Sequence, residues 1–259
     1  MISYLTSLIL GLVEGVTEFL PISSTGHLIL VNQWFSFGEP FTKLFDIVIQ
    51  SGAILAVIVL FWKDIWPASW KFSELKNKWG TILAAFIPTA IIGFLFGKIA
   101  QQYLFTPIVV AAALVFYGII FLILESRKSQ GQKDTVSYRD AIIIGLVQAL
   151  ALVPGTSRSG ATIIGLLLLG YARPAAARFS FLLAIPTLLA AGGYSLLKYS
   201  APISGSEVIL LALGFLASFV SAYLVSRWFM AYISHKNFTP FAWYRIVLGL
   251  IVAFFVIWA

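Results

Sequence analysis

The sequence contains no cysteine and little charge. Without cysteine among its 259 residues, the chain has neither disulfide bridges nor thiolate metal sites. Charged residues make up only 10% of the chain and hydrophobic residues 60%, whereas a typical soluble domain carries about 25% charged residues. The mean hydropathy is +0.97. We therefore expect this chain to fold in a membrane rather than in water.

Long apolar stretches recur along the chain and are separated by polar segments. Most of them approach the roughly 17–25 residues that a helix needs to cross the hydrocarbon core of a bilayer. We predict an all-α integral membrane protein with six transmembrane helices, at Phe45–Trp62, Thr81–Phe96, Ile108–Leu124, Phe179–Leu197, Val208–Val225 and Trp243–Trp258.

Two further apolar segments, Leu5–Phe37 and Ala141–Tyr171, are interrupted in the middle by Pro, Ser, Thr and Gly. Each fits either a kinked crossing helix or a re-entrant helix-loop-helix hairpin. Irregular backbone is not tolerated where it faces lipid, so these loops must be buried in protein or line a wet cavity. This requirement makes both loops candidate sites, and we predict two re-entrant hairpins beside the six spans.

The net charge of +7 is interpreted as a topology signal, and no nucleic-acid partner is expected. With the amino terminus outside, only Lys43, Lys98 and Lys198 fall on the outer side, and Arg158 and Arg245 lie at membrane depth. Twelve basic residues then fall inside, which supports this orientation: Lys63, Lys71, Lys76, Lys78, Arg127, Lys128, Lys133, Arg139, Arg173, Arg178, Arg227 and Lys236.

The chain also repeats itself at an offset of 134 residues. Leu10–Leu30 aligns without gaps on Ile144–Ile164, and 6 of the 21 positions are identical. Each half then holds one hairpin and three spans, and because three is odd the second half enters the membrane from the opposite side. We predict a single membrane domain, residues 1–259, built from inverted repeats at about 1–125 and 137–259. The loop tips Leu20–Gly26 and Pro154–Gly160 should face each other near the midplane.

The first hairpin carries two carboxylates, Glu14 and Glu18, spaced so that they share one helix face. Carboxylates inside a membrane are costly and are by default functional or paired. Together they could bind a divalent cation, share a proton, or leave one as a general base. The alternative is a structural pair neutralised by an arginine.

Hydroxyl groups and a histidine follow Pro21, which ends the first helix of this hairpin. Ser23, Ser24 and Thr25 stand at the start of the next helix, where they could be ordinary caps. A helix amino terminus also attracts phosphate through its free N–H groups and its dipole. A serine here could act as a nucleophile with a glutamate or His27 as its base.

The second loop replaces these acids with an arginine-centred set. At the offset of 134, Ser24 corresponds to Arg158, and donors from Ser157, Ser159 and Thr162 surround it. A guanidinium matches phosphate oxygens, so the two loops together indicate phosphoryl transfer. Arg158 could instead only neutralise the two glutamates. Arg245 is expected to pair with a carboxylate or to extend toward the membrane surface.

Both loops resemble a known family. The segment from Glu14 to His27, EGVTEFLPISSTGH, looks like the first signature of the undecaprenyl-diphosphate phosphatase (bacitracin-resistance) family. The segment from Pro154 to Thr162, PGTSRSGAT, resembles its second signature. The resemblance covers effectively the whole chain and extends through Phe45–Trp62, Phe179–Pro186 and Phe238–Arg245.

The resemblance implies that this chain hydrolyses undecaprenyl diphosphate to the monophosphate carrier of peptidoglycan synthesis and confers bacitracin resistance. It also implies dependence on a divalent cation, Mg²⁺ or Ca²⁺, with Glu14 and Glu18 as the candidate ligands. We expect the protein to lie in the bacterial inner membrane, with its active site facing the periplasm. The expected partners are the lipid substrate and membrane lipid, and the sequence does not decide between a monomer and a homodimer.

Carried over by position, the catalytic set is Glu14, Glu18, Ser24, His27 and Arg158. We predict Ser24 as the nucleophile, activated by Glu18, with His27 assisting and Arg158 holding the diphosphate; His27 as nucleophile is the rival. The substrate-binding set consists of Ser23, Thr25, Ser157, Ser159 and Thr162. The alternative function is a polyprenyl-phosphate transporter or flippase, because inverted repeats and broken helices are typical of transporters.

Overall fold

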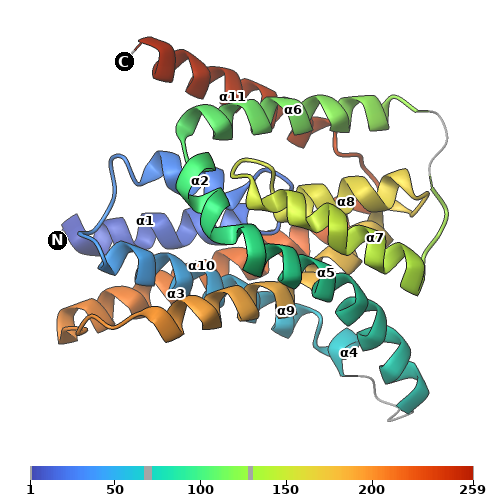
Figure 1. Ribbon diagram of the computed structural model, residues 1–259, viewed down its shortest axis with the longest axis horizontal. Helices are drawn as coiled ribbons and strands as arrows, with labels where there is room; N and C mark the ends of the chain where they lie inside the picture. Colours follow the sequence, from blue (N-terminus) through green and yellow to red (C-terminus); the bar gives the residue numbers. More distant parts are fainter. Residues whose placement is uncertain (1, 67–71, 128–130, 259) are drawn as a thin grey trace.

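The computed structural model describes residues 2–66, 72–127 and 131–258, and this part of the chain is helical without a β-sheet (Figure 1). Lys71 and Lys128, two of the basic residues predicted inside, lie outside the described residues. The elements are α1 (Ile2–Thr17), α2 (Ser24–Val31), α3 (Phe41–Leu60), α4 (Trp62–Ile65), α5 (Phe72–Leu104), α6 (Pro107–Glu125), α7 (Tyr138–Gln148), the 3-10 helix η1 (Ala149–Leu152), α8 (Arg158–Leu168), α9 (Arg173–Lys198), α10 (Gly205–Ile233) and α11 (Thr239–Trp258).

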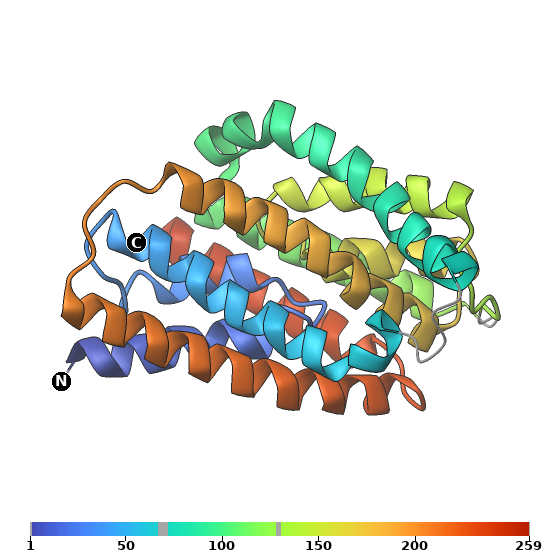
Figure 2. The same cartoon turned by 90° about the horizontal axis from the view of Figure 1, so that it is seen from below.

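Among the described residues, six helices are long and apolar enough to cross a membrane, and each contains most of one predicted span. The six-span prediction is therefore confirmed, and the protein is a multi-pass membrane protein. Figure 2 shows the long helices side by side, with the start of α1 and the end of α11 toward the same end of the bundle. The spans are Phe41–Leu60, Trp79–Leu104, Pro107–Glu125, Arg173–Lys198, Gly205–Ile233 and Thr239–Ile257.

Local residue chemistry sets the helix boundaries. Pro107 stands in the first turn of α6, where its missing N–H costs no hydrogen bond. A capping box starts α10: the Ser204 hydroxyl accepts from the backbone N–H of Glu207, and the Glu207 carboxylate accepts from that of Ser204. Gly170, with a φ of 84°, turns the chain after α8.

Apolar side chains cover the outside of the bundle as well as its core. Phe94 on α5 is 76% exposed, and large apolar residues on the other long helices are exposed in the same way. In water such a surface would drive aggregation, but against lipid tails it is favourable. The exposed apolar surface therefore agrees with a bilayer location.

The two interrupted segments each form two short helices that contact each other, α1 with α2 and α7 with α8. Figure 1 shows α1 and α2 toward one end of the bundle and α7 and α8 toward the other, with their connecting loops between them. Helix α1 packs along α10 of the second half, and α7 packs along α5 of the first half. Each pair is thus held mainly by a span from the other half of the chain.

Glycines allow these close helix contacts. A side chain on Gly11 or Gly15 of α1 would collide with backbone carbonyls of Gly214 or Ser218 in α10. On α7, a Cβ atom at Gly145 would lie 2.9 Å from the carbonyl carbon of Ala85 in α5. Small residues that let two backbones approach are the usual means of packing membrane helices.

Gly145→Ala is expected to destabilise the protein, because its methyl group meets backbone that cannot rotate away. The overpacking cost is about 1–3 kcal/mol. The matched control is Gly93→Ala on α5, where a Cβ atom would meet nothing within 4 Å and the helix gains up to about 1 kcal/mol in propensity. Thermal unfolding in detergent should show a lower midpoint for Gly145→Ala only. Equal midpoints for the two variants would contradict the packing described here.

Candidate active site

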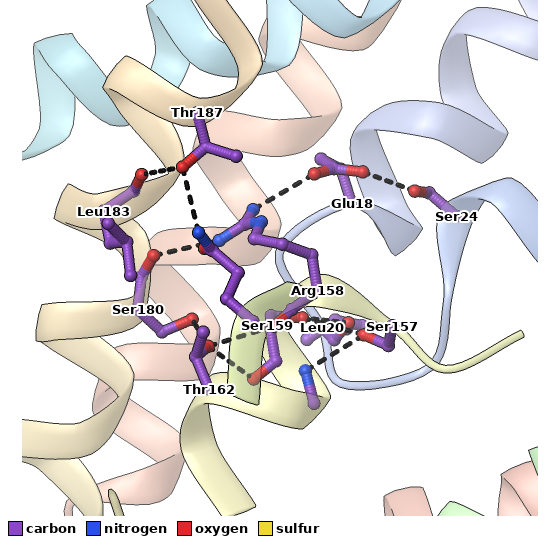
Figure 3. A network of polar contacts seen from close by, with 12 residues as sticks. Glu18, Leu20, Ser24, Ser157, Arg158, Ser159, Thr162, Ser180, Leu183 and Thr187 are labelled. Carbon is purple, nitrogen blue, oxygen red and sulfur yellow. Dashed lines mark hydrogen bonds and ion pairs between the residues drawn. The ribbon is translucent and has the colours of Figure 1, made fainter. Parts of the chain in front are cut away.

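A chain of three side chains joins the two loops (Figure 3). Arg158, the first residue of α8, donates from Nη2 to Oε1 of Glu18 at 3.0 Å. The other carboxylate oxygen of Glu18 accepts a hydrogen bond from the hydroxyl of Ser24, the first residue of α2. Arg158 is steadied by a second bond, from Nη1 to the Ser180 carbonyl of α9 at 2.9 Å. The carboxylate and the guanidinium expected to meet across the repeat are in direct contact.

This ion pair is almost completely shielded from solvent. The side chains of Arg158 and Glu18 are 9% and 5% exposed, and Ser24 is 6% exposed. Removing one partner of such a pair leaves an uncompensated charge in a medium of low dielectric constant. The Nε atom of Arg158 is buried without a hydrogen-bond partner, so one donor of the guanidinium is left for a further acceptor.

The two loops share an unusual backbone conformation at equivalent positions. Ser23 and Ser157, which are 134 residues apart, have φ values of 73° and 69°. Each precedes a helix, and each side chain accepts from the N–H three residues later: Gly26 at 3.3 Å and Gly160 at 3.1 Å. Residues other than glycine adopt positive φ at a cost of about 1–3 kcal/mol, and the hydroxyl cap offsets part of it.

Hydrogen bonds also tie the loops to each other and to α9. The Ser159 hydroxyl donates to the Leu20 carbonyl of the first loop at 3.0 Å and lies 3.0 Å from the Ser157 hydroxyl. Thr162 shares a hydrogen bond of 2.7 Å with the Ser180 hydroxyl. Figure 3 shows these side chains below the Glu18–Arg158 pair, between the second loop and α9. Their hydroxyls therefore hold the loops together.

Arg245 of α11 hydrogen-bonds to the backbone of both loops. We had expected a carboxylate partner or a position near the membrane surface. The residue is completely buried. It donates to the carbonyl of Pro21 at 2.9 Å, and to those of Gly155 and Thr156 at 2.8 and 3.0 Å. Among the described residues no carboxylate forms an ion pair with it. Backbone carbonyls of both loops, and that of Ala113 in α6 at 3.4 Å, serve as its acceptors instead.

His27 lies on α2 and faces α11. Its Nδ1 atom is 2.7 Å from the Ser23 carbonyl, and its Nε2 atom is 2.7 Å from the Tyr244 hydroxyl. The two rings are stacked with an interplanar angle of 3°. Both ring nitrogens therefore have protein partners, and no contact described for His27 joins it to Ser24 or Glu18.

A cavity of about 560 Å³ opens beside the Glu18–Arg158 pair. Its polar end contains Glu18, Arg158 and four hydroxyl residues of the loops: Ser23, Ser24, Thr25 and Ser157. Apolar and small residues of α5 and α9 form its walls, among them Phe86, Ala90, Phe94, Leu188 and Ala191. Glu14, His27, Ser159 and Thr162 are not among the described residues that line it. The cavity thus combines charged and hydroxyl residues of the loops with a largely apolar wall, which also carries Lys98 and Gln101 of α5.

A comparison with protein-family models gives one match, over residues 7–251, to the family described as bacitracin resistance protein BacA. The matched region contains both loops, Arg245, the first five spans and 13 of the 19 residues of the last span. The chain belongs to this family.

Relatives of this BacA-family chain are found in distant bacteria. A protein of Polaromonas sp. strain JS666 is 49% identical over 254 residues, covering 94% of this chain and 92% of its own length. An Enterococcus faecalis protein is 42% identical over 265 residues, covering 97% and 96%. A Limosilactobacillus fermentum protein is 44% identical over 267 residues, covering 97% of both chains. All three relatives carry the name undecaprenyl-diphosphatase.

The BacA-family site includes polar residues that the sequence interpretation did not assign. The Gln148 amide donates to the hydroxyls of Thr89 at 2.9 Å and Thr187 at 3.2 Å, and all three residues line the cavity. Gln148 occupies the repeat position of Glu14, which was the one available sequence signal. Ser180 and the two threonines lie on spans where an isolated hydroxyl carries no distinguishing pattern.

Glu14 is buried one helical turn before Glu18, and its Oε1 atom has no hydrogen-bond partner. Within the described residues no group of three or more His, Asp and Glu side chains could hold a metal ion. Magnesium, however, is commonly bound by one or two carboxylates together with substrate phosphates. The free oxygen of Glu14 fits that arrangement, with the diphosphate supplying the remaining ligands.

Proposed function

We propose that this protein hydrolyses undecaprenyl diphosphate to undecaprenyl phosphate and inorganic phosphate, the activity named for its relatives. The observation that carries the proposal is the Ser24–Glu18–Arg158 chain at the polar end of the cavity. A hydroxyl, a base and a cation within reach of one phosphorus are more than a lipid-binding site needs. Hydrolysis of a phosphoanhydride through a phosphoserine uses all three.

In the proposed reaction, Ser24 Oγ attacks the terminal phosphorus and its proton passes to Glu18. The bond from this phosphorus to the bridging oxygen breaks, and undecaprenyl phosphate leaves. Water then attacks the phosphoserine and the P–O bond to Ser24 breaks; Ser24 Oγ takes its proton back from Glu18, and inorganic phosphate leaves together with the proton that the water loses. Arg158, which lines the cavity, binds a phosphate oxygen through its guanidinium and stabilises the charge that develops in each step.

The amino termini of α2 and α8 support binding of the diphosphate. These helices begin at Ser24 and Arg158, two residues that line the polar end of the cavity. The free N–H groups and the positive dipole end of a helix favour an anion in this position. Ser23, Thr25 and Ser157, which line the same end, are the proposed hydroxyl contacts. Ser159 and Thr162 support the loops from outside the cavity.

The divalent cation belongs to the same proposal. Glu14 and Glu18 would hold Mg²⁺ or Ca²⁺ together with oxygens of the diphosphate. A bound cation would offset the negative charge of the diphosphate while Arg158 orients it. The unpartnered oxygen of Glu14 supports this assignment.

The apolar part of the cavity suits the start of the isoprenoid chain. Its walls, residues 86–101 of α5 and residues 187–195 of α9, include Phe86, Phe94 and Leu188. An isoprenoid chain placed there would keep its hydrocarbon out of water while the diphosphate reaches Arg158. In the proposed orientation this end of the bundle faces the periplasm, and the bilayer is the bacterial inner membrane.

An inverted repeat with two re-entrant hairpins explains why the loops are built alike. In this arrangement α1 and α7, α2 and α8, and the three spans that follow each pair are equivalent. Several features support it: the matching serine caps, the packing of α1 on α10 and of α7 on α5, and a close-packed glycine at equivalent positions 11 and 145. The repeat would bring an acidic loop and a basic loop to one pocket from opposite membrane faces.

The proposed function is tested with purified wild-type protein in detergent or in vesicles. Release of inorganic phosphate from undecaprenyl diphosphate, together with formation of the monophosphate lipid, is the expected result. A polyprenyl-phosphate transporter would instead bind the lipid and move it between leaflets without releasing phosphate. Tight binding of undecaprenyl diphosphate without any phosphate release would therefore reject hydrolysis.

A further inference from the structure

Arg245 is the largest completely buried side chain among the described residues. Burying a guanidinium in a membrane protein is costly unless its charge and its donors are satisfied. Arg245 has no carboxylate partner in the part of the chain that the structure describes. Such a residue requires an explanation beyond packing.

The hydrogen bonds of Arg245 show which segments of the chain it connects. Its Nη1 atom binds the Pro21 carbonyl, which lies three residues before Ser24. Its Nη2 atom binds the carbonyls of Gly155 and Thr156, just before Arg158. One planar group therefore spans the first loop and the second loop, which are separated by about half of the chain.

The rigid fork of a guanidinium suits this bridging role. Its donors have fixed directions in one plane, so the carbonyls that they bind are held at a fixed separation. Tyr117 of α6, with its ring centroid 5.7 Å from the guanidinium carbon, covers the group from one side. A lysine at this position would keep the charge but could not hold both loops in the same geometry.

We propose that Arg245 is a positioning residue of the phosphatase. It sets the register of the two loops so that Ser24 and Arg158 act on the same phosphorus atom. The inference rests on the hydrolysis proposed above. Arg245 itself does not line the cavity, so it acts through the loops and not by touching the substrate.

The test compares Arg245→Lys with wild-type protein, using undecaprenyl diphosphate in detergent micelles. A small misplacement of reacting groups is enough to cost roughly 100-fold in rate. We therefore expect kcat to fall about 100-fold, while KM stays close to the wild-type value because Arg158 still binds the diphosphate. Rates are measured on protein that elutes as a single folded species.

The matched control is Arg173→Lys. Arg173 is another largely buried arginine, but it pairs with Glu125 at the end of α6 and does not contact the loops. Both substitutions remove buried hydrogen bonds and should lower the unfolding temperature. Only Arg245→Lys should lower kcat, because a purely structural role would affect folded yield and stability and leave the rate per folded molecule unchanged.

A double-mutant cycle with Arg158→Lys tests whether Arg245 acts by placing the second loop. If Arg245 acts by placing the second loop, the double variant should be at most about threefold slower than Arg158→Lys alone, because contacts in one network are not additive. Losses that multiply, or wild-type kcat in Arg245→Lys, would overturn the positioning role. Absence of phosphate release by wild-type protein would instead reject the proposed function, so the two failures are distinguishable.

Discussion

Replacing Ser24 by alanine is expected to reduce phosphate release from undecaprenyl diphosphate by at least about a thousandfold, the scale of loss seen when a nucleophile is removed. The substitution deletes the atom of the protein that attacks phosphorus in the first step of the proposed mechanism. It leaves Arg158 and both helix termini in place, so binding of the diphosphate should change by no more than a few-fold. Turnover is measured as inorganic phosphate released, and affinity as the Kd of the lipid.

Three further variants control this prediction. Ser234→Ala removes an exposed hydroxyl at the end of α10 and should leave turnover unchanged. His27→Gln and Tyr244→Phe each remove one contact between α2 and α11, and should slow turnover only about tenfold, the worth of one hydrogen bond. Loss of all activity in His27→Gln with normal activity in Ser24→Ala would make the imidazole the nucleophile.

Arg158→Lys is the second substitution with a large expected effect. Lysine keeps the positive charge but cannot bind the Ser180 carbonyl, Glu18 and a phosphate oxygen in the geometry of one guanidinium. We expect kcat to fall about 100- to 1000-fold, as for the loss of a group that stabilises a developing oxyanion. Steady-state kinetics of phosphate release provide the measurement.

The control for Arg158→Lys is Arg178→Lys, which alters a more exposed ion pair with Asp64. Exposed pairs contribute about 0–1 kcal/mol, so this variant should retain wild-type kcat and KM. If Arg158→Lys also retained wild-type kcat, a general positive charge would be sufficient and the fork geometry of Arg158 would have no role in the reaction.

The spans and the pairing of the two loops could be predicted from the sequence because both depend on local patterns. Hydropathy over some 20 residues identifies a span without knowledge of its neighbours. At the offset of 134 residues, Ser24 aligns with Arg158. The repeat predicted that the two loop tips would face each other, which brings Glu18 near the arginine. The structure places these three residues in contact.

The surroundings of the loops could not be predicted in the same way. Arg245 was expected to find a carboxylate, because sequence shows charges but not the backbone carbonyls that a folded loop presents. His27 was expected to assist Ser24, and the structure shows that its ring nitrogens contact the Ser23 carbonyl and the Tyr244 hydroxyl. Contacts between residues more than 200 positions apart depend on how the spans pack, which no short motif records.

The positive φ of the two serine caps affects the entropy that is lost when the lipid substrate binds. Ser23 and Ser157 hold a backbone shape that an isolated peptide would avoid, so the folded bundle must impose it before any ligand arrives. Little entropy then remains to be lost when the anionic headgroup arrives. Amide hydrogen exchange at Gly26 and Gly160, whose N–H groups bond to the two capping serines, should be slow already in the lipid-free protein, and adding the lipid should slow it only slightly further.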